Sequence, residues 1–80
     1  MATREENETK FGHWTDHADG TRTYWYATGG KHGWYARYVK HVDVHDQTLS
    51  FRQEVYNENR ELVEIHGKYP IDKGHQRVRE

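Results

Sequence analysis

The chain contains no cysteine, a single proline and no long run of apolar residues. Without cysteine there is no disulfide, no thiolate nucleophile and no zinc site built on sulfur. An apolar run of about 18 residues, which a membrane-spanning helix or a signal-peptide core would approach, is also missing. We therefore expect a cytoplasmic protein that has no membrane partner.

An excess of charge of one sign is missing as well. The 12 Lys and Arg residues nearly balance the 13 Asp and Glu residues, so the formal net charge is −1. No overall positive field therefore draws the chain to nucleic acid. Cations are nevertheless concentrated near the end of the chain, at Lys68, Lys73, Arg77 and Arg79. We expect residues 73–80 to form a basic C-terminal tail, through which a nucleic-acid binder would contact phosphates.

Apolar residues are scarce, at 32% of 80 residues, which is near the size where one core is barely sufficient. Aromatic residues offset this shortage at 14%, because large rings bury much area per residue. So many rings are unusual in a disordered chain. We expect one folded domain over residues 11–72, preceded by a disordered N-terminal tail over residues 1–10.

Four segments are rich in β-forming residues and are separated by turn signals, which predicts strands over residues 21–28, 34–44, 49–57 and 61–69. No segment shows a sustained helical period. The pattern is typical of an all-β fold, a four-stranded antiparallel meander. Such a sheet leaves one apolar face uncovered, so we expect it to curl into a small barrel or to pack face to face as a homodimer.

The register of the last three strands follows from the alternation of apolar residues, because successive side chains point to opposite faces of a strand. A four-residue loop at residues 45–48 places Val42 opposite Phe51. An odd-length loop at residues 58–60 then keeps the apolar residues of the last strand on that same face. We therefore predict one apolar face and one polar face.

The same pairings place His41, Arg52 and His66 in one row on the polar face, with Glu54 in the next row. Directly paired residues have Cβ atoms ~5 Å apart. Two imidazoles, a guanidinium and a carboxylate suit metal-independent RNA cleavage, with acid and base groups beside a cation that holds the phosphate. In side-chain types the set resembles the sheet-face active sites of small microbial ribonucleases. One hypothesis is therefore a metal-independent ribonuclease in which these four residues are catalytic.

Our leading hypothesis is a small non-enzymatic binding module, of a size that fits a microbial or viral accessory protein. It would act as a homo-oligomer and contact a protein or a small anionic or nucleotide-like ligand. Tyrosine and tryptophan offer stacking surfaces, and the Gly29–Gly33 loop and nearby cations offer polar contacts. The residues expected to bind the ligand are Tyr24, Tyr26, Lys31, His32, Trp34, Arg37, Tyr56 and Lys68.

Histidine is unusually frequent, at seven of 80 residues. His41, Asp43 and His45 alternate along one predicted strand, so all three would lie on the same face. Successive residues on one face are ~7 Å apart, which is too far for a tight zinc site. We therefore predict neither a metal site nor another cofactor.

Overall fold

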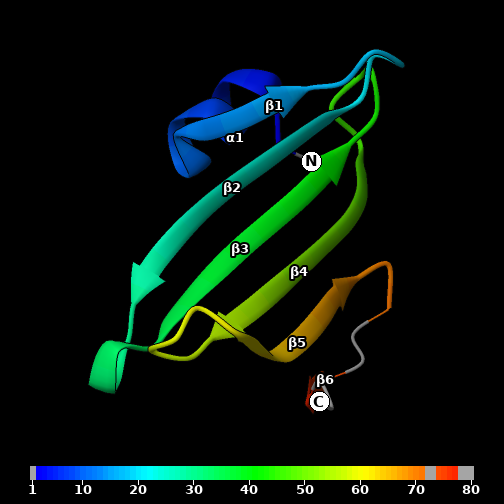
Figure 1. The fold of residues 1–80 in the computed structure, drawn as a ribbon. Helices are drawn as coiled ribbons and strands as arrows, with labels where there is room; N and C mark the ends of the chain where they lie inside the picture. The colour runs from blue at the N-terminus through cyan, green and yellow to red at the C-terminus, as the bar shows by residue number, and fades with distance from the viewer. Residues whose placement is uncertain (1, 72–73, 78–80) are drawn as a thin grey trace.

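A computed structural model describes residues 2–71 and 74–77, most of which belong to one antiparallel sheet. Its strands follow chain order: β1 (His13–Asp16), β2 (Arg22–Gly29), β3 (Tyr35–Val42), β4 (Thr48–Tyr56), β5 (Leu62–Tyr69) and β6 (Gly74–Arg77) (Figure 1). The predicted antiparallel meander is confirmed, and β2 to β5 match the four expected strands closely. The count of four is wrong, because the sheet has six strands. The order ends at β1 and β6, so the sheet is open and the described strands close no barrel.

A helix, α1 (Arg4–Phe11), precedes the sheet in the region where we expected disorder over residues 1–10. Its first turn is closed by a capping box: the Thr3 hydroxyl accepts from the Glu6 amide, and the Glu6 carboxylate accepts from the Thr3 amide. Its C-terminus ends at Gly12, which adopts the left-handed conformation that favours glycine. Local capping at both ends therefore defines a helix that has almost no apolar period.

The core lies between α1 and one side of the sheet, which we call the helix face. Phe11 is 3% exposed and its ring contacts those of Tyr24, Tyr26 and Phe51. Val42 completes the buried cluster. In Figure 1 the helix lies near β1 and β2, so it covers one end of the sheet only. The other side of the sheet is called the far face below.

Three hairpins share one turn geometry, with loops at residues 18–20, 44–46 and 58–60. In each, the residue before the loop pairs through its amide with the carbonyl of the residue after it, and the third loop residue has positive φ. That third residue is Gly20, Asp46 or Arg60. A three-residue loop of this kind needs a left-handed residue at its end. The three-residue loop predicted at residues 58–60 is confirmed.

The loop predicted at residues 45–48 is wrong, since the turn occupies residues 44–46. The Asp43 carboxylate accepts from the amides of His45 and Gln47 and so fixes the shorter turn. Leu49 is an extra residue on β4, because Val42 pairs with Thr48 and His41 with Ser50. The turn and this bulge together place Phe51 opposite Lys40 rather than Val42. The shift is two residues, so Val42 and Phe51 still share the helix face, as predicted.

The β4–β5 pairing contains two irregularities, and these overturn the predicted alignment. Leu62 pairs with Tyr56, but Glu64 pairs with Val55, so Val63 is an extra residue on β5. Each bulge of one residue exchanges the faces of the residues that follow. The side chains of Glu64 to Gly67 therefore lie on the faces opposite to those predicted, and the second irregularity returns Tyr69 to the helix face opposite Phe51.

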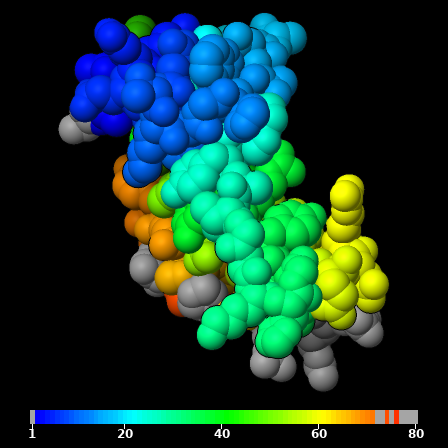
Figure 2. Space-filling model, turned by 90° about the vertical axis from the view of Figure 1, so that its left-hand side faces the viewer, coloured from blue at the N-terminus to red at the C-terminus, as the bar shows by residue number. Residues whose placement is uncertain are grey.

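Strand β6 (Gly74–Arg77) lies within the segment expected to be a basic tail, and it pairs with β5. Lys73 and Arg79 of that predicted tail lie outside the described residues. Figure 2 shows the N-terminal segment (blue) capping one end of the molecule, with the orange end of β5 beneath it. The described residues contain no helix long and apolar enough to cross a membrane.

Candidate functional site

The structure does not form the predicted row of His41, Arg52 and His66. His41 lies opposite Ser50, and Arg52 lies opposite Val39 on one side and Gly67 on the other. His66 lies opposite Gln53, which places it on the helix face. The shorter turn and the bulge at Leu49 moved the first pairing, and the bulge at Val63 moved the second. The arrangement on which the ribonuclease hypothesis depended is therefore absent.

On the far face, three side chains of β4 are linked by hydrogen bonds. Arg52 donates from Nε to Glu54 at 2.7 Å, and the Tyr56 hydroxyl donates to the other Glu54 oxygen at 2.8 Å. Burial, followed by the neighbouring Glu54, raises the pKa of Tyr56. The Tyr56 ring also stacks on Tyr35 at 4.9 Å between centroids. Glu54 is thus held by two donors, which suits a structural carboxylate better than a free general base.

Arg37 is the other cation of the far face that we expected to bind a ligand. Its guanidinium lies over the Trp25 ring, 5.5 Å from the centroid, and Trp25 stacks in turn on His13. The Nε atom of Arg37 is buried and has no hydrogen-bond partner in the structure. Arg37 therefore packs as a planar cation on an aromatic ring.

The remaining predicted ligand-binding residues do not form one site. Tyr24 is fully buried in the core, Tyr26 stacks on Tyr38, and Lys68 lies over that same Tyr38 ring. A short 3₁₀ helix, η1 (Lys31–Gly33), contains Lys31 and His32 of the set, and the neighbouring Trp34 indole donates to Glu58. The expected residues are therefore distributed over the core, the helix face and a distant turn.

A cleft that the sequence did not reveal lies on the helix face, between the end of α1 and the end of β5. Its volume is about 500 Å³. Aromatic rings from three elements form its apolar walls, and two ammonium groups reach it from α1 and β3. The described residues that line it include no carboxylate: they are Lys10, Phe11, Lys40, Gln47, Thr48, Phe51 and Tyr69.

The two lysines are held close to the Phe11 ring. The Lys10 and Lys40 Nζ atoms lie 5.7 and 6.0 Å from its centroid. Burial lowers the pKa of Lys40, the neighbouring Lys10 lowers it further, and Asp46 partly opposes both. The Lys40 ammonium is therefore poorly solvated and is repelled by the positive charge of Lys10. An anion in the cleft would stabilise the charged form of Lys40.

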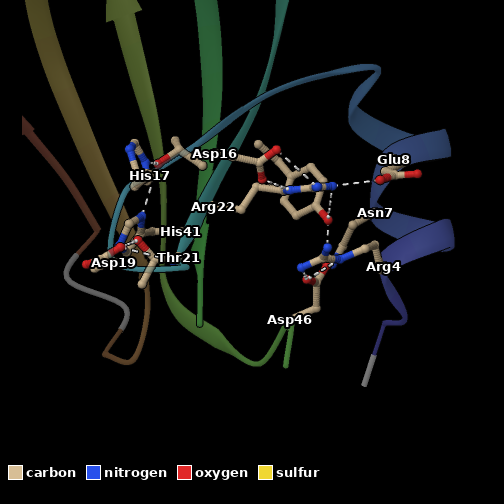
Figure 3. Close-up of polar contacts among 12 residues, drawn as sticks. Arg4, Asn7, Glu8, Asp16, His17, Asp19, Thr21, Arg22, His41 and Asp46 are labelled. Atoms are coloured by element: carbon tan, nitrogen blue, oxygen red, sulfur yellow. Dashed lines mark hydrogen bonds and ion pairs between the residues drawn. The ribbon is translucent and has the colours of Figure 1, made fainter. Parts of the chain in front are cut away.

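A polar network that includes Arg4, Asn7 and Asp46 (Figure 3) positions Lys40. Lys40 donates from Nζ to Asn7 Oδ1 at 2.9 Å, and Asn7 donates to Asp46. Asp46, only 4% exposed, also accepts from Tyr24 at 2.5 Å and from Arg4 at 3.0 Å. Burial alone would raise the pKa of Asp46, but these hydrogen bonds outweigh it and the pKa is lowered. An ionised Asp46 thus fixes the amide that orients Lys40.

A second buried cation anchors α1 to the sheet beside this network. Arg22 is 7% exposed; it donates to Asp16 on β1 and to Glu8 on α1, each at 2.6 Å. Its guanidinium also lies over the Trp14 ring. Burial disfavours the charge of Arg22, but the two carboxylates outweigh burial and raise its pKa. Arg22 and Asp46, the two buried charged side chains of the helix–sheet interface, are therefore both paired with opposite charges.

Comparison with known proteins supplies no family: the sequence matches no protein-family model, and no curated protein or solved structure is significantly similar to it. Among the described residues, no group of three or more His, Cys, Asp or Glu side chains is placed to hold a metal ion. The function proposed below therefore depends on the geometry of the chain itself.

Proposed function

We propose that this protein is a small cytoplasmic, non-enzymatic binding module whose helix-face cleft takes an anionic ligand with a flat apolar body. The observation that carries the proposal is the combination of aromatic walls with two ammonium groups in one cleft of about 500 Å³. This volume is in the range of small-molecule sites, which are mostly apolar with a few polar groups that fix orientation. Aromatic carboxylates, sulfonates and phosphate esters have the required chemistry.

The anionic end of the ligand is inferred from the state of the two lysines. Lys40 is held in place by Asn7, so little side-chain entropy remains to be lost when an anion binds to it. Lys10 is exposed and approaches the same ring from the helix. A unit charge about 4 Å from such an ammonium contributes roughly 1–4 kcal/mol in a partly solvated site.

The apolar end is inferred from the walls. The Phe11 and Phe51 rings meet edge to face at 6.2 Å between centroids, and Tyr69, which is 49% exposed, flanks the opening. Ring pairs of this kind favour a flat aromatic body over a branched aliphatic one. The two ends together define a ligand in which a ring system carries one negative charge.

The experiment uses two dyes with the same ring system. One is 1-anilinonaphthalene-8-sulfonate, and the other is N-phenyl-1-naphthylamine, which lacks the sulfonate. We expect saturable one-to-one binding of the sulfonate, followed by its fluorescence, and weaker binding of the neutral amine. Lys10→Met and Lys40→Met should each weaken sulfonate binding at least about fivefold and leave amine binding nearly unchanged.

Lys31→Met is the matched control, because Lys31 is an exposed lysine of η1. Lys40→Met leaves the buried Asn7 carbonyl oxygen without its donor, so Lys10→Met carries the test if that variant unfolds. Equal binding of the two dyes, or equal losses in Lys10→Met and Lys31→Met, would contradict the proposal.

A further inference from the structure

A second feature, unrelated to the cleft, lies where the β1–β2 turn meets the far face. The Thr23 hydroxyl is contacted by two imidazoles at once: His17 Nε2 lies 2.7 Å from Thr23 Oγ1, and His41 Nδ1 lies 3.0 Å from it. The two rings are 5.6 Å apart between centroids and are inclined by 46°. Two ring nitrogens therefore converge on one point.

The convergence is built into the sheet rather than left to flexible side chains. Thr23 on β2 and His41 on β3 are directly paired across the strands. His17 begins the tight turn that joins β1 to β2, and its amide donates to the Thr21 carbonyl. The pairing of β2 with β3 and the geometry of the turn thus place the two imidazoles beside the Thr23 hydroxyl (Figure 3).

The hydrogen bonds allow a nitrogen lone pair at the shared point. A threonine hydroxyl donates one proton, so it can donate to one imidazole while it accepts from the other. In that arrangement the accepting imidazole directs its lone pair at Thr23 Oγ1, and the donating imidazole would present a lone pair there in its other tautomer. Neutral imidazole with an available lone pair is the form that binds transition metals.

The ring geometry matches that of two histidines on one ion. Zinc–nitrogen bonds of about 2.05 Å at a tetrahedral angle place the two nitrogens roughly 3.3 Å apart and the ring centroids roughly 5 Å apart. The observed separation of 5.6 Å differs from this by about a tenth. Small rotations of the two rings about their side-chain bonds would complete the arrangement.

The geometry points to a two-histidine site for a borderline divalent metal, Zn²⁺ or Cu²⁺, made by His17 and His41 with Thr23 beside it. The two imidazoles supply nitrogen ligands, which suit Zn²⁺ and Cu²⁺ better than Mg²⁺ or Ca²⁺. Water would fill the remaining coordination positions, because no described His, Cys, Asp or Glu side chain is placed to complete a three-residue cluster.

His17 is exposed and His41 is half-buried, so an ion can reach the site without opening the fold. The test is a titration of the full chain with CuSO₄ near neutral pH, followed by electron paramagnetic resonance. We expect one-to-one binding with a nitrogen splitting that reports two imidazoles. His17→Gln and His41→Gln should each weaken binding at least about tenfold.

His45→Gln is the matched control, because His45 is exposed in the β3–β4 turn. A second measurement uses the wild-type chain and so does not depend on how the variants fold: ZnSO₄ should shift the imidazole nitrogen signals of His17 and His41 and leave those of His45. Zinc-induced shifts on other histidines alone, or Cu²⁺ binding that both variants retain, would overturn the site.

Discussion

Two residues with the same backbone conformation have opposite roles in this protein. Asp46 and Arg60 each end a three-residue turn with φ near +60°. Asp46 is buried and accepts from three side chains, whereas the Arg60 side chain is exposed. A left-handed residue with a side chain costs roughly 1–2 kcal/mol. The network compensates for this cost at Asp46, while nothing that the structure describes does so at Arg60.

Replacement by glycine should therefore have opposite effects at the two turns. Arg60→Gly should raise the free energy of unfolding by up to about 1 kcal/mol, since part of the relieved strain is offset by a freer unfolded chain. Asp46→Gly should lower it by roughly 3 kcal/mol, because buried donors lose a charged partner. Urea denaturation measures both changes. Similar changes at the two positions would show that Asp46 does not anchor the helix.

Lys40 makes the proposed binding depend on pH. Its pKa lies below the usual Lys value, chiefly because of burial. An anion in the cleft favours the charged form, so affinity for the sulfonate dye should be highest below the lowered pKa. It should fall as pH rises through that value, at a lower pH than an ordinary lysine would give. This fall should be absent in Lys40→Met and present in Lys31→Met; an identical profile in both would exclude Lys40 as the group responsible.

At the scale of elements, the strands were predictable and α1 was not. Strands β2 to β5 are rich in aromatic and β-branched residues over about eight positions each and are separated by turn residues, which reveals them. Helix α1 has one apolar side chain, Phe11, so no helical period exists to be seen. The sequence did contain one signal for this helix, the spacing of Thr3 and Glu6. A threonine followed three residues later by a glutamate is typical of a capping box at a helix N-terminus, even where no helical period is present.

That cap supplies a test of how α1 is held. Thr3→Ala should destabilise the protein by about 1 kcal/mol, because the Glu6 amide loses its acceptor. Thr9→Ala is the matched control: Thr9 is an exposed position within the helix, where alanine is the better helix former. Hydrogen exchange of the α1 amides should be faster than in the wild-type chain for Thr3→Ala and unchanged for Thr9→Ala. Equal exchange in the two variants would show that the cap does not hold the helix.

The register errors explain why the predicted row of His41, Arg52 and His66 does not form. The apolar pattern identifies which β4 residues face the core, but it does not reveal a bulge, and one extra residue at Val63 exchanged the faces from Glu64 to Gly67. The cleft was not predicted for a different reason. It combines the end of α1 with the end of β5, which are near one another only once the helix is placed on the sheet.

At the scale of the whole molecule, the open sheet leaves part of its helix face without a cover. Beside Phe11 this face carries half-buried Tyr26 and Tyr38, and half-buried Val55 lies on the same face. The face-to-face dimer expected from the sequence stays a prediction, and this surface is where we expect it. Light scattering should give a mass that rises toward two chains with concentration.

Val55→Lys should keep the protein monomeric at all concentrations, since a lysine would have to be desolvated at the centre of that interface. Val44→Lys is the matched control, because Val44 is 53% exposed in a turn. A wild-type chain that remains monomeric at the highest concentration reached would refute the dimer and leave the ligand cleft unaffected.

The claim on which the account most depends is that the helix-face cleft binds flat anions. Nuclear magnetic resonance of the wild-type chain, titrated with 1-anilinonaphthalene-8-sulfonate, tests its location without any substitution. We predict saturating shifts at Phe11, Lys40 and Phe51, with Tyr35 and Tyr56 of the far face unchanged. Shifts concentrated on those two far-face tyrosines, with the three cleft residues unmoved, would contradict the account.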